Sequence, residues 1–237
     1  MHLLAIETAT DACSAVLADD DVEVAAWRDI THQDLCRRLA HEIGDMLEGA
    51  GSGFAALGLV AVGLGPGSFT SLRVGLATAK GIALVRGLPV VGVSSLAAMA
   101  WQACRVGRSG LLCPVLDARR GEMYAAVHRV VGDRVEEVQA PFVAGAAGLA
   151  RKLSALPEPV LLFGRLEDVP AREVADITAG AVRLWPEGPG APDAAAVAQL
   201  GRRRYDREGA DDLAGLRPIY VRKSYAEEKL NLDLGLR

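Results

Sequence analysis

The segment 60–81 joins three patterns that together restrict the fold: an apolar run, a Gly-Pro-Gly turn and a helix rich in small residues. The apolar run at 60–64 predicts a buried strand, and Gly65 and Gly67 let the backbone turn sharply. In the helix that follows, small and apolar residues cover nearly the whole circumference, which predicts burial on most sides. The segment therefore indicates an α/β protein in which a strand leads through a tight turn into a packed helix.

The Gly-Pro-Gly turn has two interpretations. Gly65 and Gly67 leave backbone N–H groups unscreened and Ser68 can cap the helix, so the turn could hold an anion. Alternatively, the glycines only make a tight connection between the strand and the helix. The residues of the turn leave both interpretations open.

The same residues carry a resemblance to a known family. The run Gly-Pro-Gly-Ser-Phe-Thr-Ser-Leu-Arg at 65–73 resembles the motif of the TsaB (YeaZ) family, in which glycine is usual where this chain has Ser71. Further similar blocks lie at 3–10, 89–96, 116–124 and 218–222. Glu7 belongs to the first block, at a position where Asp is commoner in the family. The resemblance is densest in the first half of the chain, and residues 130–217 add little to it.

The resemblance implies the ASKHA fold, named after actin, sugar kinases and Hsp70, with two lobes that each contain a mixed sheet flanked by helices. We expect an N-terminal lobe at 1–108 with the Gly-Pro-Gly loop and the dimerisation helices, a C-terminal lobe at 109–215, and a segment 216–237 that could pack back on the N-terminal lobe. In the first lobe, patterns predict strands at 3–8, 12–18, 22–28, 59–64 and 89–93 and helices at 32–49, at 69–86 and after Ser94. In the second, they predict strands at 111–117, 122–130 and 160–163, helices at 144–155 and 193–207, and a hairpin turn at Arg119-Arg120-Gly121.

Metal ligands are missing from the positions where the resemblance would place them. In the catalytic paralogue of the family, two histidines of one block bind an active-site metal, whereas this chain has Ser95 and Met99 there. Neither side chain is a good ligand for a hard or borderline divalent metal. The spacing of the four histidines does not rebuild such a site: His2, His32, His41 and His128. We therefore expect no metal site.

A nucleotide site is the second kind of site to consider. ASKHA ATPases place an acidic residue near magnesium at the end of the first strand, where this chain has Glu7. With Gly65, Gly67 and Ser68, Glu7 forms the candidate nucleotide site. The alternative is an acidic residue that is only solvated or caps a turn, since the first loop lacks the glycine of strong ATPases. We expect no tightly bound cofactor in this chain, with ATP and Mg²⁺ entering at the level of a complex.

Composition restricts the partners and the compartment. The net charge is −4, so strong binding of nucleic acid by this chain alone is not expected. The arginine run at 202–204 is interpreted as a solvated helix face in preference to a tRNA contact, and Asp117, Arg119 and Glu122 as cleft residues or a hairpin ion pair. The four cysteines lack the spacing of a metal site, and neither a signal peptide nor a membrane span is expected. These features predict a reduced, cytoplasmic protein.

The helices at 32–49 and 69–86 carry more apolar surface than one lobe needs. The resemblance implies that the family dimerises through this pair, either with itself or with the catalytic paralogue TsaD. We expect seven residues to make the contact: Leu35, Leu39, Ile43, Met46, Leu72, Leu76 and Ala79.

The expected function follows from the resemblance and from the missing ligands. It is a non-catalytic dimerisation or platform subunit needed for threonylcarbamoyl transfer to N6 of adenosine 37 in tRNA (t6A). The implied partners are TsaD and the ATPase TsaE, with a homodimer when the chain is alone and tRNA reached only through the complex. An independent ASKHA enzyme is the alternative, either a metallopeptidase of the glycoprotease type or a sugar-kinase-like phosphotransferase. A structural or regulatory binding module outside tRNA modification is a third class.

Overall fold

The computed structural model describes residues 1–30 and 34–222 and divides into two compact units. The first unit comprises Met1–Ala98 and Pro192–Pro218, and the second comprises Met99–Ala191 and the chain from Ile219 onward. These limits differ from the expected lobes at 1–108 and 109–215, because the division falls inside a helix and the chain later returns to the first unit. The expected segment 216–237 is shared between the units, and its residues 223–237 lie outside the described residues.

The first unit is built on a five-stranded mixed sheet in the order β3-β2-β1-β4-β5. β1, β2 and β3 pair antiparallel, whereas β4 and β5 run parallel to β1. The predicted order of elements is confirmed: three strands separated by turns, a helix, a strand, a helix and a strand. The strands are β1 (His2–Glu7), β2 (Cys13–Asp19), β3 (Val22–Asp29), β4 (Leu57–Gly63) and β5 (Val90–Val93).

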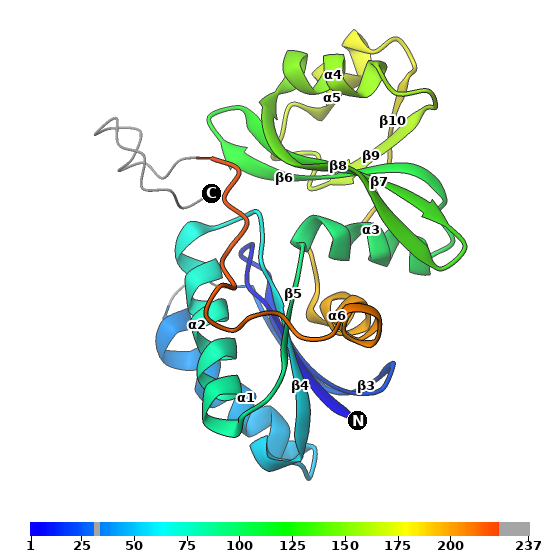
Figure 1. The fold of residues 1–237 in the computed structure, drawn as a ribbon. Helices are drawn as coiled ribbons and strands as arrows, with labels where there is room; N and C mark the ends of the chain where they lie inside the picture. The colour runs from blue at the N-terminus through cyan, green and yellow to red at the C-terminus, as the bar shows by residue number, and fades with distance from the viewer. Residues whose placement is uncertain (31–33, 223–237) are drawn as a thin grey trace. The chain divides into compact units, whose positions relative to one another are not determined.

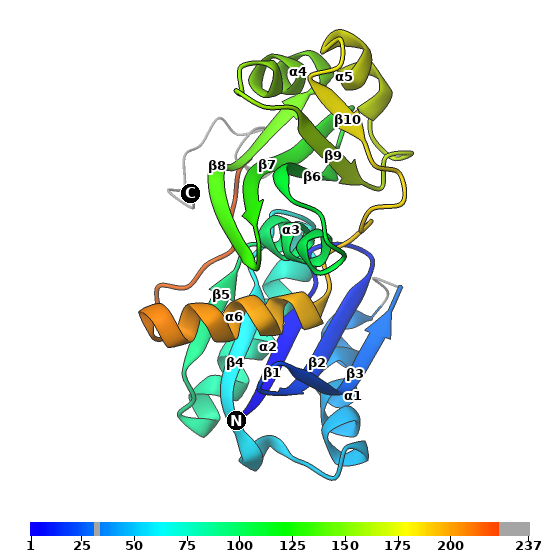
Figure 2. The ribbon, with the colours of Figure 1, turned by 90° about the vertical axis from the view of Figure 1, so that its right-hand side faces the viewer.

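Helices cover both faces of this sheet (Figure 1). α1 (Leu35–Gly49) and α2 (Phe69–Arg86) lie on one face, and the short 3₁₀ helix η1 (Phe54–Ala56) follows α1. α6 (Ala194–Glu208) lies across β1, β2 and β4 on the other face (Figure 2). The sheet is therefore the middle layer of three.

The prediction that placed the helix at 193–207 in the second lobe is wrong. α6 packs on the first sheet, and Gly201 allows the close approach because a side chain there would contact the methyl group of Ala61. Asp193 caps the helix by accepting a hydrogen bond from the N–H of Ala195, and the Ser14 hydroxyl of β2 accepts another from the N–H of Ala194 at 2.9 Å. Sequence periodicity locates such a helix but does not indicate which sheet it covers.

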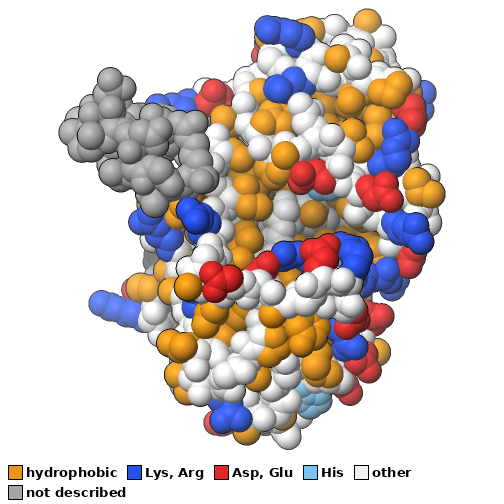
Figure 3. Space-filling model, in the orientation of Figure 1, with side chains coloured by type: hydrophobic (Ala, Val, Ile, Leu, Met, Phe, Trp, Pro, Cys, Tyr) orange, Lys and Arg blue, Asp and Glu red, His pale blue; other side chains and the backbone are white. Residues whose placement is uncertain are grey.

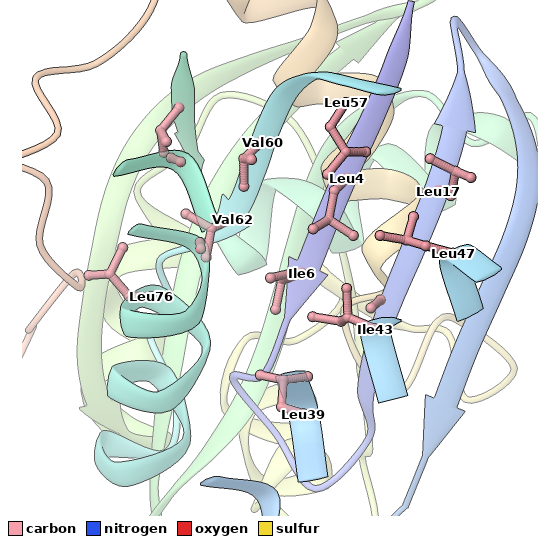
Figure 4. Packing of buried hydrophobic residues seen from close by; sticks show 14 of the residues in the cluster. Leu4, Ile6, Leu17, Leu39, Ile43, Leu47, Leu57, Val60, Val62 and Leu76 are labelled. Carbon is pink, nitrogen blue, oxygen red and sulfur yellow. The ribbon is translucent and has the colours of Figure 1, made fainter. Parts of the chain in front are cut away.

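The apolar stripe of α1 faces its own sheet. Leu39, Ile43 and Leu47 are fully buried and lie against leucine and isoleucine side chains of β1 and β2 (Figure 4). Several residues of the partner contact predicted from the sequence belong to this buried face, and the contact itself stays a prediction. A stripe of this width is what one sheet face needs for burial, so it indicates a core as readily as an interface. Met46 packs half-buried against that core, and the other six predicted contact residues are buried: Leu35, Leu39, Ile43, Leu72, Leu76 and Ala79.

The second unit has a separate five-stranded sheet in the order β10-β9-β6-β7-β8. The predicted hairpin at Arg119-Arg120-Gly121 joins the central strand β6 to its antiparallel neighbour β7. α4 and α5 share a core with the sheet, and α3 (Ser95–Arg105) begins in the first unit and ends in the second. The remaining elements are β6 (Gly110–Arg119), β7 (Glu122–Val131), β8 (Arg134–Gly145), α4 (Ala146–Ser154), β9 (Val160–Gly164), α5 (Ala171–Ile177) and β10 (Val182–Leu184). Of these, β8, α5 and β10 were not predicted.

His128 on β7 is a buried polar residue in the interior of the second unit. Its side chain is 1% exposed, and within the described residues neither ring nitrogen has a hydrogen-bond partner. Burial lowers the pKa of His128 to about 4, because the charged ring would be held away from water. The neutral ring is therefore the form that the folded unit accommodates.

We expect His128→Leu to remove an acid sensitivity of the fold. The unfolded chain binds a proton at this ring near pH 6.5 and the folded chain only near pH 4, so stability is lost as the pH falls between these values. Urea unfolding at pH 7.5 and pH 4.5 should show wild type losing about 2 to 3 kcal/mol more than the variant. Equal losses in the two proteins would contradict this burial of the neutral ring.

Candidate functional site

Glu7 lies at the end of β1 with its side chain fully buried. One carboxylate oxygen accepts a hydrogen bond from the Ser95 hydroxyl at 2.7 Å, and the other accepts one from the backbone N–H of Ala9 at 2.7 Å. Gly63 at the end of β4 has no room for a side chain, because the carboxylate of Glu7 fills that space. Glu7 thus caps the turn after β1, which is the alternative that the sequence offered to a nucleotide site. Its contacts also connect β1 to β4 and to the start of α3.

The environment of Glu7 is that of a structural carboxyl. Burial raises the pKa of Glu7 to about 7, and the hydrogen bonds from Ser95 and Ala9 act in the opposite direction. Near neutral pH the protonated and ionised forms are therefore both populated. Because both oxygens are already engaged inside the protein, these contacts weigh against a magnesium ligand at this position. Nucleotide binding by Glu7, Gly65, Gly67 and Ser68 stays a prediction.

The Gly-Pro-Gly turn uses its backbone N–H groups within the protein. The N–H of Gly65 donates to the Ser95 hydroxyl at 3.1 Å, and the N–H of Ser68 donates to the carbonyl oxygen of Ala9 at 2.7 Å. A side chain at Gly67 would strike that same carbonyl group. Ser68 caps α2 as predicted, since its hydroxyl accepts from the N–H of Ser71. The contacts favour the tight connection over the anion site, because two of the N–H donors are already paired.

Ser95 and Met99 belong to the interior, and the described histidines lie on separate elements. Ser95 and Met99 on α3 are both fully buried. His2 lies 3.4 Å from the Ser52 hydroxyl, exposed His41 lies 3.5 Å from Asp45, and His32 lies outside the described residues. Across residues 1–30 and 34–222, no group of three His, Cys, Asp or Glu side chains is placed to hold a metal ion. In the same part of the chain, no helix has both the length and the hydropathy of a membrane span.

The charged runs that the sequence indicated are paired. On α6, Arg202 pairs with Asp206, and Arg204 pairs with Asp211. In the second unit, Arg119 pairs with Asp117 at 3.1 Å, which confirms the hairpin ion pair. Glu122 pairs at 2.8 Å with Arg222, a partner that the sequence did not indicate because 100 residues separate the two.

An apolar groove lies on the outer side of α1 and α2, away from the sheet. It encloses about 450 Å³, and Arg86 is the one charged residue in its lining. Val85, one of the lining residues, is 83% exposed, and Leu84, its neighbour in the chain, is 73% exposed. Figure 3 shows hydrophobic side chains on the surface of the first unit, interspersed with polar and charged ones. The groove is lined by Ala40, Phe54, Thr78, Gly81, Ile82, Val85 and Arg86.

Sequence reasoning missed this groove, although one signal pointed to it. The apolar residues of α2 extend around the helix beyond the buried stripe, so some of them had to be exposed. Val85 belongs to this exposed part, Ile82 is half-buried and packs against the core, and Leu72, Leu76 and Ala79 are buried.

Comparison with known proteins places the chain in a family. Residues 29–156 match the family model described as TsaD, tRNA N6-adenosine threonylcarbamoyltransferase. The tRNA threonylcarbamoyladenosine biosynthesis protein TsaB of Escherichia coli is 38% identical over 129 residues, which cover 54% of this chain and about half (55%) of that protein. The protein of the same name from Bacillus subtilis is 27% identical over 231 residues, 97% of each chain. The solved structure of YeaZ from Pseudomonas aeruginosa matches with a TM-score of 0.76 at 24% identity, over 92% of this chain and 99% of that one.

These matches agree with the geometry described above. The structural match shows the fold, which is the two-sheet ASKHA fold expected from the sequence. The family model spans α1, the Gly-Pro-Gly turn, α2 and the first hairpin of the second unit, which together make up more than half of the chain. The chain belongs to the TsaB (YeaZ) family.

Proposed function

We propose that this chain is a non-catalytic subunit that pairs with a homologous TsaD-type subunit during synthesis of t6A at position 37 of tRNA. The ATPase TsaE joins the complex, the chain alone pairs with itself, and tRNA is reached only through the complex. The observation that carries the proposal is the apolar groove between α1 and α2. A concave surface that has one charged residue and an exposed valine in its lining fits a protein partner better than it fits a nucleic acid or a nucleotide.

The partner surface is the same pair of helices on a homologous chain. Residues 29–156 contain α1 and α2 and match the TsaD model, which supports equivalent helices in a TsaD-type subunit. Two equivalent faces can meet about a twofold axis, so that each inserts its protruding residues into the other's groove. Val85 in the lining and its chain neighbour Leu84 are both exposed on α2 and suit this exchange.

The buried site around Glu7 supports a role without chemistry of its own. Ser95 and Met99 occupy the positions at which the family resemblance places histidine ligands, and both are buried in α3. Glu7 is tied by Ser95 and Ala9, so it does not offer an accessible base. Transfer of the threonylcarbamoyl group is therefore assigned to the homologous subunit.

Val85→Glu should abolish pairing while leaving the fold intact. At 83% exposure a charge costs the free chain little, but in a helix-to-helix contact it would be buried without a partner. Light scattering should show a monomer, alone and when mixed with the TsaD-type subunit. With TsaD, TsaE, threonylcarbamoyl-adenylate and ATP, the variant should fail to stimulate t6A formation, as measured by mass spectrometry of tRNA nucleosides.

Val131→Glu is the matched control, because Val131 is 63% exposed and belongs to the second unit. It should pair and stimulate like wild type. Pairing by Val85→Glu at wild-type strength would contradict the groove as the contact. Full modification of tRNA without this chain, or with it as the only protein, would contradict the proposed function.

A further inference from the structure

The second sheet has one long edge strand, β8. Within residues 1–30 and 34–222, β8 pairs with β7 alone and is the last strand of its sheet (Figure 2). Residues 138–145, which form the second half of β8, include no charged residue, and Val138 is 45% exposed. The outer N–H and C=O groups of an edge strand are a template on which another strand can pair. β8 is therefore a candidate docking edge.

The other sheet edges offer less to a strand that arrives in the second unit. β10, at the opposite edge of the same sheet, has only three residues. In the first unit, the N–H of Asp211 donates to the carbonyl oxygen of Val90 on β5 at 2.8 Å, and its carboxylate accepts from the N–H of Gly92 at 2.8 Å. β3 also belongs to the first unit, whereas the chain from Ile219 onward belongs to the second. β8 is thus the long edge in the unit to which the last part of the sequence belongs.

Residues 230–236, which we call the leucine segment, have the sequence Leu-Asn-Leu-Asp-Leu-Gly-Leu. They lie outside the described residues. Leucine at every second position is typical of a strand with one buried face, because alternation puts all four leucines on the same side of a strand. The sequence therefore predicts a strand that needs both a sheet edge to pair with and an apolar surface to cover.

Arg222, the last described residue, holds the chain near the end of β8. Its guanidinium pairs with Glu122 at 2.8 Å and donates to the carbonyl oxygen of Ala118 at 3.2 Å. Glu122 is the register partner of Gly145, the last residue of β8. Residues 223–229 can span up to about 25 Å when extended, so the leucine segment can reach residues 138–145. A segment that starts at the Gly145 end runs antiparallel to β8.

We propose that the leucine segment docks on β8 of its own chain as an additional antiparallel strand of the second sheet. Backbone hydrogen bonds to the outer edge of β8 supply the affinity, as in other cases of strand addition. Phe142 and Ala144 are half-buried at the border of the core, and leucines on the same face extend that core over them. Pro141 has no N–H, so the donors of this stretch come from its other residues.

The segment of the same chain is favoured over that of a second copy. Attachment through a short linker to Arg222 gives it an effective concentration on the order of millimolar, which a second copy does not reach in dilute solution. Docking also covers an edge that would otherwise be open to association with other chains.

Hydrogen exchange of the full chain, followed by mass spectrometry, tests this docking. L232N/L234N removes two leucines, so peptides that cover 138–145 should exchange about tenfold faster or more, because the edge opens to water. The control N231T/D233T alters the opposite face with residues that favour strands and should exchange like wild type. Peptides of the central strand β6 should exchange equally in all three proteins, which verifies that the unit stays folded.

The concentration dependence of exchange identifies the chain that supplies the segment. Protection of 138–145 that is constant over about a hundredfold range of protein concentration supports docking within one chain. Protection that rises with concentration would show docking between copies and would overturn the proposal. Equal exchange in wild type and L232N/L234N would also overturn it, because the segment then does not bind β8.

Faster exchange of L232N/L234N in the first unit, with β8 unchanged, would assign the segment to the N-terminal lobe and overturn the proposal. None of these results affects the proposed function, because the groove between α1 and α2 belongs to the first unit and β8 to the second.

Discussion

Leu39→Glu is expected to unfold the first unit. Leu39 is 1% exposed and packs in the core between α1 and the sheet. Loss of a buried leucine side chain costs about 2–5 kcal/mol, and a buried carboxylate without a partner adds several kcal/mol. Together these costs match the total stability of many domains, about 5–15 kcal/mol. Trp27 of β3 packs against the same core, so its fluorescence in urea should show the cooperative transition of this unit lost or shifted to much lower urea.

Ala40→Glu is the matched control one residue further along α1. Ala40 is exposed and lines the groove, so a carboxylate there stays in water in the free chain and should leave stability nearly unchanged. The same variant should weaken pairing with a TsaD-type subunit. A Leu39→Glu protein that is as stable as wild type but monomeric would contradict the core position and would restore Leu39 to the partner contact.

These two neighbours show what periodicity can and cannot predict. The stripe that contains Leu39 predicts a buried face, because apolar side chains at helical spacing need cover. It does not say whether that cover is the chain's own sheet or a partner. Ala40 gives no hydrophobic signal by itself, and it lines a groove only because Phe54, Ile82 and Val85 come to lie beside it. The groove is therefore a product of tertiary packing, which local sequence patterns do not encode.

The elements that sequence reasoning missed are those with weak local signals. β8 contains charged residues and Pro141 in a largely exposed edge strand, so it lacks a clean alternation of apolar and polar residues. β10 has only three residues. The hydrogen bond between Glu7 and Ser95 joins positions 88 residues apart, so neither the length nor the composition of either segment could predict it. The family blocks point to both residues, but to Glu7 as part of a nucleotide site and to Ser95 at a metal-ligand position. They do not point to the hydrogen bond between the two.

Glu7→Gln should reduce the pH dependence of stability between pH 5 and pH 8. Burial raises the pKa of Glu7 to about 7, compared with 4.5 in the unfolded chain, so the folded state binds this proton more tightly. The stabilising contribution is therefore fully present below pH 4.5 and is lost as the pH rises through 7. The gap between the two pKa values corresponds to about 3 kcal/mol. Glutamine has nearly the same shape and does not titrate, so its contribution stays constant.

The measurement is the difference in free energy of unfolding between wild type and Glu7→Gln, from urea titrations at pH 5 and pH 8. Taking the difference cancels the titration of groups such as His128, and the rearranged hydrogen bond to Ser95 adds only a constant offset. Ser95→Ala tests the cause, because the Ser95 hydroxyl stabilises the ionised carboxylate and its loss should move the pH dependence to higher pH. A difference that stays constant from pH 5 to pH 8 would contradict a buried, titrating carboxyl at this junction. If the dependence is found, the Glu7 carboxyl that connects β1, β4 and α3 changes its protonation near neutral pH. Subunit pairing should then be compared between proteins at the same pH.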